Sequence, residues 1–306
     1  MTRVTAESAG GTPGDSFHTF VAPELNLAGG VVLSTTTCRE ARRLHRLAPT
    51  SCVALGRLLT AAAAAGFVQR RGALSLQIVG NGHMGQLFAD VTPEGNLRGY
   101  VKNPTLSLPQ DGKDPPLRHA VGGAIGRGQL SVIYMGQGHT FSQSTTELVS
   151  GEVDLDVEAF LDRSDQVPTA LVCDVLLDGA EVALAAGVIV QALPGGDPGA
   201  VLPIRQALRD TLATRLHDEG PDPETLIKGV LPQARRTGEP QALRWKCRCS
   251  QARAEGSLKM LGPHDLAQMV DDKETAEVVC EFCSTRYEVP PDTVEKVFLD
   301  TITGRG

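Results

Sequence analysis

The chain has 306 residues, of which 41% are hydrophobic, 21% charged and 4% aromatic. That length suits about two domains of ~100–200 residues each, and the apolar share supplies a core, which excludes a disordered or fibrous protein. The formal charge is −7 and no block of like charges stands out, so a nucleic-acid or anionic-membrane partner is disfavoured. The 33 glycines and 19 prolines predict many turns between short elements.

Three features bear on the cellular compartment. The most apolar stretches, residues 58–67 and 182–190, are shorter than the ~18–20 residues of a membrane-spanning helix. Residues 1–16 lack a basic region followed by an apolar region, so we expect a flexible tail and no secretory signal. Seven cysteines in such a chain favour reduced thiols, and hence metal or redox chemistry. We therefore expect a soluble, cytoplasmic protein.

Two helices are predicted near the start of a core domain, residues 17–194. Thr37 with Glu40 three residues later is a capping box, which predicts a short amphipathic helix as far as Pro49. An Ala-rich helix follows and is expected to end at Gly66, since glycine commonly terminates helices. The expected cap of this second helix is Thr50 or Ser51.

Alternating apolar and polar residues predict a sheet in the rest of the core domain. A helix capped by Asp154 is expected before the last two strands, which a turn at Asp178 and Gly179 joins as a hairpin. The expected class is therefore α+β, with a sheet-plus-helices core. The predicted strands are residues 74–78, 87–91, 97–101, 130–135, 169–177 and 182–190.

A run of glycine and proline at residues 194–199 marks a domain boundary. Residues 195–244 are predicted to be a helical linker, because apolar residues recur at helical spacing on two stripes within residues 201–231. Short helices are marginal alone, so these stripes must lie against an apolar surface. The remaining residues, 245–306, are expected to form a small C-terminal zinc-binding domain.

The strongest chemical signal is a set of four cysteines. Cys247 and Cys249 form one tight pair, and Cys280 and Cys283 form a second pair after thirty intervening residues. Four thiols in two pairs, near the two ends of a short segment, match the ligand pattern of a tetrahedral zinc site. The segment has too few large apolar residues to fold on its own core, so we expect metal binding to stabilise it.

The same four thiols support two hypotheses. In one, zinc merely holds the fold; in the other, the thiolates are also a switch, because thiolates are what oxidants attack. The Cα separation expected within each pair is near the ~4.4–6.8 Å of a disulfide, so each pair can close locally and expel the metal. A disulfide across one intervening residue is expected to be strained and labile. Lys246, Arg248 and Arg286 lie near enough in sequence to offset the negative charge of the site.

The other candidate ligands are interpreted differently. Cys38, Cys52 and Cys173 lie in apolar helix or strand patterns, so we expect buried core residues instead of reactive thiols. His264 lies between the two cysteine pairs but opens a helical pattern, and we do not expect it to bind the metal.

A glycine-rich segment offers a third hypothesis, a dinucleotide-dependent enzyme. Residues 80–85, GNGHMG, satisfy GxGxxG after a predicted strand. However, a strand pattern follows instead of a helix, and no acidic residue stands about twenty positions later. We interpret this segment as a hairpin turn. The sequence also lacks the GxxxxGK[ST] loop, and we do not expect an enzyme.

With these residues in view, the sequence resembles the redox-regulated heat-shock protein 33 family, the 33-kDa chaperonins, nearly end to end. The four cysteines stand at the family spacing, and three further stretches match: QIVGNG at residues 77–82, LRGYV at 97–101 and RSDQVPT at 163–169. There are two departures. His83-Met84 stands where the family often has a proline-containing pair, and Ser-Asp-Gln replaces the commoner Ser-Glu-Gln.

The resemblance implies an ATP-independent holdase that is silent when reduced and bound to one Zn²⁺ per chain. Oxidation would form the disulfides Cys247–Cys249 and Cys280–Cys283, release zinc, unfold the C-terminal domain and loosen the linker. Exposed apolar surface, on the linker or the core sheet, would then hold unfolding client proteins under oxidative stress. Homodimerisation and hand-off to ATP-dependent foldase chaperones are also implied. The alternative is a zinc-ribbon-type binding module in which zinc is purely structural.

Overall fold

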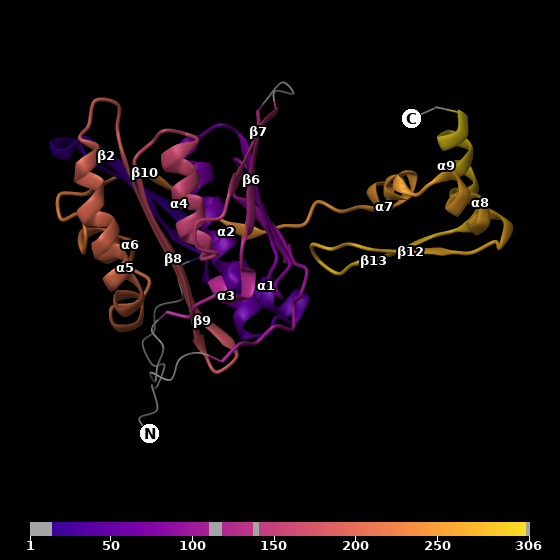
Figure 1. Ribbon diagram of the computed structural model, residues 1–306, viewed down its shortest axis with the longest axis horizontal. Helices are drawn as coiled ribbons and strands as arrows, with labels where there is room; N and C mark the ends of the chain where they lie inside the picture. Colours follow the sequence, from indigo (N-terminus) through magenta and orange to yellow (C-terminus); the bar gives the residue numbers. More distant parts are fainter. Residues whose placement is uncertain (1–13, 110–117, 137–140, 304–306) are drawn as a thin grey trace.

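The computed structural model describes residues 14–109, 118–136 and 141–303, in which a layered body carries a small C-terminal domain (Figure 1). Two largely antiparallel sheets enclose a layer of helices, and two linker helices cover the outer face of one sheet. The predicted α+β class is thus confirmed. Sheet A has the order β10 (Arg235–Ala242), β1 (Ser16–Ala22), β2 (Leu27–Leu33), β9 (Glu181–Ala192), β8 (Thr169–Asp178). Sheet B has the order β11 (Arg244–Trp245), β5 (Asn96–Val101), β4 (Gln86–Val91), β3 (Ala73–Gly80), β6 (Gly128–Met135), β7 (Phe141–Glu147).

Helices fill the layer between the sheets and the layer outside sheet A. The inner helices are α1 (Thr35–His45), α2 (Pro49–Gln69), α3 (Gly122–Ile125) and α4 (Val153–Arg163), and the outer, linker helices are α5 (Val201–Asp218) and α6 (Pro223–Lys228). Two short 3-10 turns, η1 (Pro23–Leu25) and η2 (Pro198–Ala200), complete this body.

The central helix, α2, is the longest element of the core. Its residues from Thr50 to Gly66 are all buried, because one sheet lies on each side of it. Among the described residues it is the one helix long and apolar enough to cross a membrane. However, 89% of its most apolar 18-residue stretch is buried inside the protein. A helix that is apolar all round is typical of a core. The predicted end at Gly66 was wrong: a Cβ there would lie 2.7 Å from Val91 Cγ1, so the glycine serves close packing and the helix continues to Gln69.

The predicted cap of α1 was also wrong. The helix begins at Thr35, and Asp15 supplies the cap from the preceding segment, because its carboxylate accepts hydrogen bonds from the amides of Thr36 and Thr37. Asp15 and Ser16 are therefore buried parts of the body instead of the predicted tail. The rest of that tail, residues 1–13, lies outside the described residues.

Tertiary contacts also replaced the caps predicted for the other two helices. The helix α2 begins one residue before Thr50, so neither Thr50 nor Ser51 is its N-cap. The Ser51 hydroxyl instead donates to the carbonyl of Asn103 at 2.7 Å. Asp154 lies in the first turn of α4, where both carboxylate oxygens accept hydrogen bonds from the Arg118 guanidinium at 2.7 Å. Each side chain thus bonds to a segment distant in sequence.

Apart from its edge strand β10, sheet A is covered on both faces, and this explains why the linker helices carry apolar stripes. Along β2, Val32 points into the core around α2, whereas Val31 and Leu33 point toward the linker helices, as the alternation of a strand requires. The apolar stripes of α5 and α6 cover that second face. The buried residues of these stripes are Ile204, Leu208, Leu212, Leu216, Leu226 and Ile227.

Within sheets A and B, the sequence analysis missed β1, β2, β7, β10 and β11; it also missed both strands of the hairpin at residues 276–289. The strand β2 reads Leu-Ala-Gly-Gly-Val-Val-Leu, and β7 and β10 are mostly polar, so none shows clear alternation. The linker is consequently not helical throughout, since β10 follows its helices. The glycine-rich segment was predicted correctly as a hairpin turn, between β3 and β4. A Cβ on Gly80 would lie 2.1 Å from the carbonyl oxygen of Ile125, so the glycine allows this turn to pack against α3.

Candidate metal centre

The C-terminal domain is small and has little core of its own. Six buried hydrophobic residues form it, among them Leu266 and Val289. A core of this size is marginal without a metal or disulfide to support it. The elements of the domain are α7 (Gln251–Ser257), η3 (Leu258–Met260), α8 (Pro263–Asp271), β12 (Ala276–Val279), β13 (Arg286–Val289) and α9 (Pro291–Thr303).

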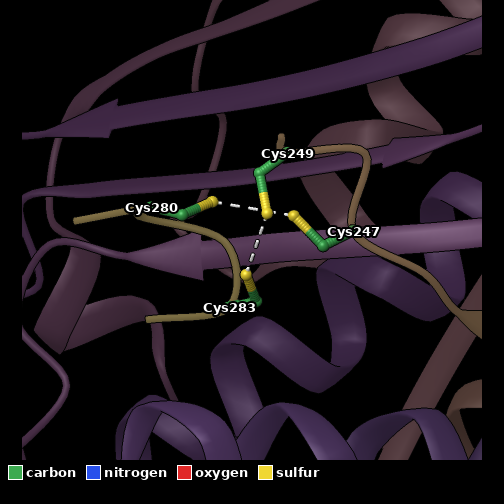
Figure 2. Close-up of side chains that lie close together, drawn as sticks. All are labelled: Cys247, Cys249, Cys280 and Cys283. Atoms are coloured by element: carbon green, nitrogen blue, oxygen red, sulfur yellow. Dashed lines mark hydrogen bonds between the residues drawn. The ribbon is translucent and has the colours of Figure 1, made fainter. Parts of the chain in front are cut away.

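Two loops bring the four predicted cysteines together (Figure 2). Their Sγ atoms all lie within 4.8 Å of one another, with Cys247 to Cys280 at 3.6 Å and Cys249 to Cys283 at 3.4 Å. Zinc–sulfur bonds of ~2.3 Å in a tetrahedron require sulfurs about 3.8 Å apart. The donor set and its spacing therefore fit one zinc ion.

The second cysteine pair sits on a tight turn at the end of the β12–β13 hairpin. The amide of Cys280 donates to the carbonyl of Thr285 at 2.9 Å, and the amide of Ser284 donates back to the carbonyl of Cys280 at 2.8 Å. Ser284 adopts the left-handed conformation, with φ +57°. This turn directs two thiols to one side of the hairpin, facing the first pair.

The pKa values of the thiols differ because their surroundings differ. Burial raises the pKa of Cys247 to about 12 and also raises the pKa of Cys280. Burial acts in the same direction on Cys283, but hydrogen bonds from the Thr285 hydroxyl and amide and from neighbouring thiols outweigh it and lower its pKa to about 7. Cys283 is thus the thiol of these three that ionises most easily, and thiolates are the form that binds metals and reacts with oxidants.

A hydroxyl from β13 supports the first pair. The Tyr287 hydroxyl donates to Cys249 Sγ at 2.9 Å, and this bond raises the tyrosine pKa to about 12. Groups that hydrogen-bond to a metal ligand orient it and tune its charge. Sequence reasoning missed Tyr287, and its only signal was a position four residues beyond Cys283.

Between the two cysteines of the second pair, Phe282 contacts the body of the protein. Its ring meets Phe88 and Tyr100 edge-on, with centroids 5.6 and 5.3 Å apart, and the guanidinium carbon of Arg98 lies 3.9 Å from its centroid. His45 of α1 bonds to the Phe282 carbonyl at 3.1 Å. The turn that carries two of the candidate metal ligands is therefore docked on β4 and β5.

The first pair is likewise tied to sheet B through its neighbours. The Arg248 guanidinium bonds to the buried carboxylate of Asp90 at 2.6 Å, which also accepts from Arg98 at 2.9 Å. Two residues before Cys247, Trp245 of β11 pairs in parallel with Leu97 of β5. The segment that carries the first pair is thereby attached to the edge of sheet B.

The remaining candidates lie elsewhere. Cys38, Cys52 and Cys173 are buried in the body, as predicted, and burial raises the pKa of each, that of Cys52 to about 12. His264 is exposed in α8, and within the described residues the candidate metal cluster contains only the four cysteines.

The linker helix α5 is fixed to the body by ion pairs as well as by its apolar stripe. Glu158 of α4 accepts hydrogen bonds from Arg209 at 2.6 Å and from the amide of Leu171 at 2.8 Å, and pairs with Arg205 at 3.1 Å. Arg205 also reaches Asp162 at 2.6 Å. Departure of α5 would remove both arginines from Glu158, whose side chain is only 4% exposed, and leave it the Leu171 amide.

The molecule thus consists of an α+β body and a small docked domain, on which four convergent thiols form a candidate metal centre. The family model described as Hsp33 protein matches residues 15–290. The chain therefore belongs to the Hsp33 family, the 33-kDa chaperonins, and shares the chaperone role of that family.

Individual relatives agree along nearly the whole length. The chain is 34% identical over 290 residues to a 33 kDa chaperonin of Synechococcus sp. (strain JA-3-3Ab), covering 88% of this chain and 85% of the relative. It is 37% identical over 287 residues to that of Rippkaea orientalis, covering 89% and 92%. Among solved structures, the 33 kDa chaperonin (heat shock protein 33 homolog) of Thermotoga maritima matches with a TM-score of 0.80 at 27% identity, covering 94% and 99%.

Proposed function

We propose that this protein is a redox-regulated, ATP-independent holdase, whose switch is the tetrad Cys247, Cys249, Cys280 and Cys283. The observation that carries the proposal is the position of this tetrad: the turn that holds two of its thiols also carries the docking residue Phe282. Thiol chemistry and domain docking therefore share one loop. The domain bounds we propose are 17–194 for the core, 195–244 for the linker and 245–306 for the switch.

In the reduced state the four thiolates hold one Zn²⁺, which supplies folding free energy to a domain with a very small core. Structural zinc contributes ~10–16 kcal/mol in finger peptides, at or above the ~5–15 kcal/mol net stability of a whole domain. Six buried hydrophobic residues supply little in comparison. The resting fold of residues 245–306 thus depends on thiolates that remain reduced.

Oxidation removes these ligands in pairs. One molecule of hydrogen peroxide takes two electrons from two thiolates, which form a disulfide, while its O–O bond breaks and its two OH groups each take up a proton from the solvent and leave as two waters. Two such steps, giving Cys247–Cys249 and Cys280–Cys283, consume all four ligands and release the ion.

Loss of the metal then uncouples the domain from the body. The domain unfolds, and Phe282 separates from Phe88 and Tyr100. The pairing of Trp245 with β5 then lacks the support of the folded domain that follows it in the chain. The linker is freed at its C-terminal end, and α5 and α6 expose apolar surface on themselves and on sheet A. Large apolar patches of this kind bind other proteins.

The partners that fit such a surface are unfolding client proteins. We propose further that the oxidised form dimerises, hands clients to ATP-dependent foldase chaperones, and acts in the cytoplasm under oxidative stress. Dimerisation would cover part of the newly exposed apolar surface while no client is bound.

The test measures client aggregation, zinc content and free thiols in one preparation. Reduced protein should hold about one zinc per chain and leave aggregation of a heat-unfolded client unchanged. After peroxide treatment it should lose the zinc and four thiols and suppress aggregation. Cys280→Ser should fail to hold zinc, whereas the matched control Cys52→Ala should behave as the unmodified protein does. Oxidised, zinc-free protein that leaves aggregation at its full rate overturns the proposal and favours purely structural zinc.

A further inference from the structure

The last strand of the linker, β10, is attached to sheet A by its backbone. It pairs antiparallel with β1, from Arg235 opposite Val21 to Ala242 opposite Ser16. All its side chains are exposed except that of Gln241, which is half-buried. Main-chain hydrogen bonds, and not apolar burial, therefore hold this strand at the edge.

The residues of β10 have a weak tendency to form a strand. Gly238 has φ +68°, Pro240 has no amide hydrogen to donate, and the register shifts opposite the segment between Phe17 and Thr19. Glycine and proline weaken strands, whereas β-branched and aromatic residues favour them. A segment of better strand-forming residues would hence compete well for the same edge.

The partner strand β1 stays in place without β10. Phe17 and Phe20 are 4% and 1% exposed and point into the cores on opposite faces of sheet A. On its other side, β1 pairs with β2 along its whole length, from Ser16 to Ala22. If β10 leaves, β1 presents a row of unpaired N–H and C=O groups, which is a template for another strand.

A hollow flanks the β1–β10 ladder on each face of the sheet. One, of about 610 Å³, is lined by Phe17 and Thr19 of β1 together with Phe67 and Val91. The other, of about 350 Å³, is lined by Ser16, His18 and Leu33, among other residues. Side chains of a strand paired with β1 would alternate between these two hollows, the arrangement by which strand-addition sites take up side chains.

The edge is connected closely to the metal centre. Four residues separate β10 from Cys247, and two of them, Arg244 and Lys246, donate backbone hydrogen bonds to Gly95 and Leu97 at 3.0 and 2.8 Å. Unfolding of the domain removes the anchor immediately after this segment. Release of the metal therefore weakens the attachment of β10 at this end, where the buried Leu243 and its amide bond to the Asp15 carbonyl at 2.9 Å remain.

We propose that the edge of β1 is a strand-addition site, which β10 occupies at rest and an extended segment of an unfolding client occupies after oxidation. This inference rests on the proposed function and names the class of ligand: an extended backbone with alternating apolar side chains. Main-chain pairing accepts many sequences, which suits clients that share none. In the resting protein β10 is an internal competitor for the site.

The first experiment tethers β10 to β1 in the full-length chain. Thr19 and Thr237 are opposite each other, and directly opposed antiparallel residues have Cα atoms ~4.5–5.5 Å apart, within bridging distance. The variant T19C/T237C is bridged with a short thiol-specific crosslinker while zinc protects the tetrad, and is then oxidised; T19C and T237C alone are the controls. We expect zinc loss equal to that of the unmodified protein, with at least tenfold weaker suppression of client aggregation.

The outcomes separate this inference from the proposed function. Full suppression by the tethered protein overturns the strand-addition site alone. Failure of the untethered, oxidised protein to suppress aggregation overturns the proposed function and this inference together.

A second experiment needs no variant and so does not depend on folding of the double mutant. A hexapeptide of alternating threonine and valine competes with reduced, carboxymethylated α-lactalbumin for the oxidised protein. The same peptide N-methylated at two consecutive central residues loses a donor on each edge but keeps its side chains. We expect the first peptide to displace the client and the methylated one to compete at least tenfold more weakly. Equal competition, no competition, or dissociation of a dimer without client displacement overturns the proposal.

Discussion

Arg98 of β5 holds Phe282 of the cysteine turn against the body, with its guanidinium carbon 3.9 Å from the ring centroid. The two residues are 184 positions apart in sequence, and the contact joins the candidate metal centre to sheet B. The docking of the cysteine turn on sheet B therefore involves a side chain that is not one of the four candidate metal ligands.

Removing the Phe282 ring should loosen the docking without removing a ligand. Aromatic pairs contribute ~0.5–1.5 kcal/mol and a cation–π contact ~0.5–2 kcal/mol, so Phe282→Ala should make undocking tenfold or more easier. Hydrogen exchange of the Lys246 amide, which bonds to the Leu97 carbonyl, should speed up in the reduced, zinc-bound protein. Leu299→Ala, on the exposed side of α9, is the control and should change nothing. Unchanged exchange in F282A would contradict the coupling role.

Deleting one hydroxyl should weaken the metal centre selectively. Tyr287→Phe removes the O–H···S bond to Cys249 and keeps the ring. Loss of such a supporting bond lowers metal affinity ~10–100-fold, and we also expect faster oxidation, because the Cys249 thiolate becomes more nucleophilic. Competition with a chelator and the rate of thiol loss to peroxide measure the two effects. Tyr134→Phe, whose hydroxyl bonds to Asp165 instead, should retain normal zinc affinity.

Zinc affinity should rise with pH. The metal binds thiolates, so each thiol whose pKa lies above the ambient pH must lose a proton on binding. Burial raises the pKa of Cys247 to about 12, so this thiol releases a full proton throughout the range from pH 6 to 8. The pKa of Cys283 is about 7, so this thiol adds to the number of protons released on zinc binding mainly below pH 7. Calorimetry in buffers of different ionisation enthalpy should show more protons released at pH 6 than at pH 8. An equal or smaller number at pH 6 would contradict these assignments.

The stability of the body should fall as the pH rises through neutrality because of Glu158. Burial raises the pKa of this carboxyl from 4.5 to about 7, against the opposing effects of the Leu171 amide and of Arg205 and Arg209. A carboxyl with a raised pKa binds its proton more tightly when folded. Its contribution is therefore complete below pH 4.5 and lost as the pH rises through 7, by up to about 3 kcal/mol.

Glu158→Gln should remove this dependence. Urea unfolding of both proteins at pH 5 and pH 8 gives the difference directly, and effects of pH on the metal centre cancel between them. We expect the unmodified protein to lose more stability than E158Q between these pH values. The opposite sign would mean that the ion pairs with α5 outweigh burial.

The metal centre was predictable because its signal is local. Two tight cysteine pairs at this spacing have few uses other than a metal site, and the structure brings all four together. Phe282 could not be predicted in the same way, since a phenylalanine between two cysteines does not reveal the Phe88 and Tyr100 rings that it meets.

The fold was predictable where periodicity was strong, as in β3 to β6 and along α5. The prediction failed where a residue distant in sequence determines the local structure. Asp15 caps α1 from outside the helix, so the sequence around Thr37 gives no hint of the true start. The strand β10 shows no alternation because its side chains are mostly exposed and backbone bonds pair it with β1. A polar segment with Gly238 and Pro240 resembles a loop in sequence.

The most direct test of the central claim titrates the reduced protein with peroxide while following zinc release, disulfide formation by peptide mapping and suppression of client aggregation. The account predicts that the three rise together, with one zinc released for the pair of disulfides Cys247–Cys249 and Cys280–Cys283. Suppression that reaches its maximum while the zinc is still bound, or full zinc loss that leaves the protein inactive, would contradict it.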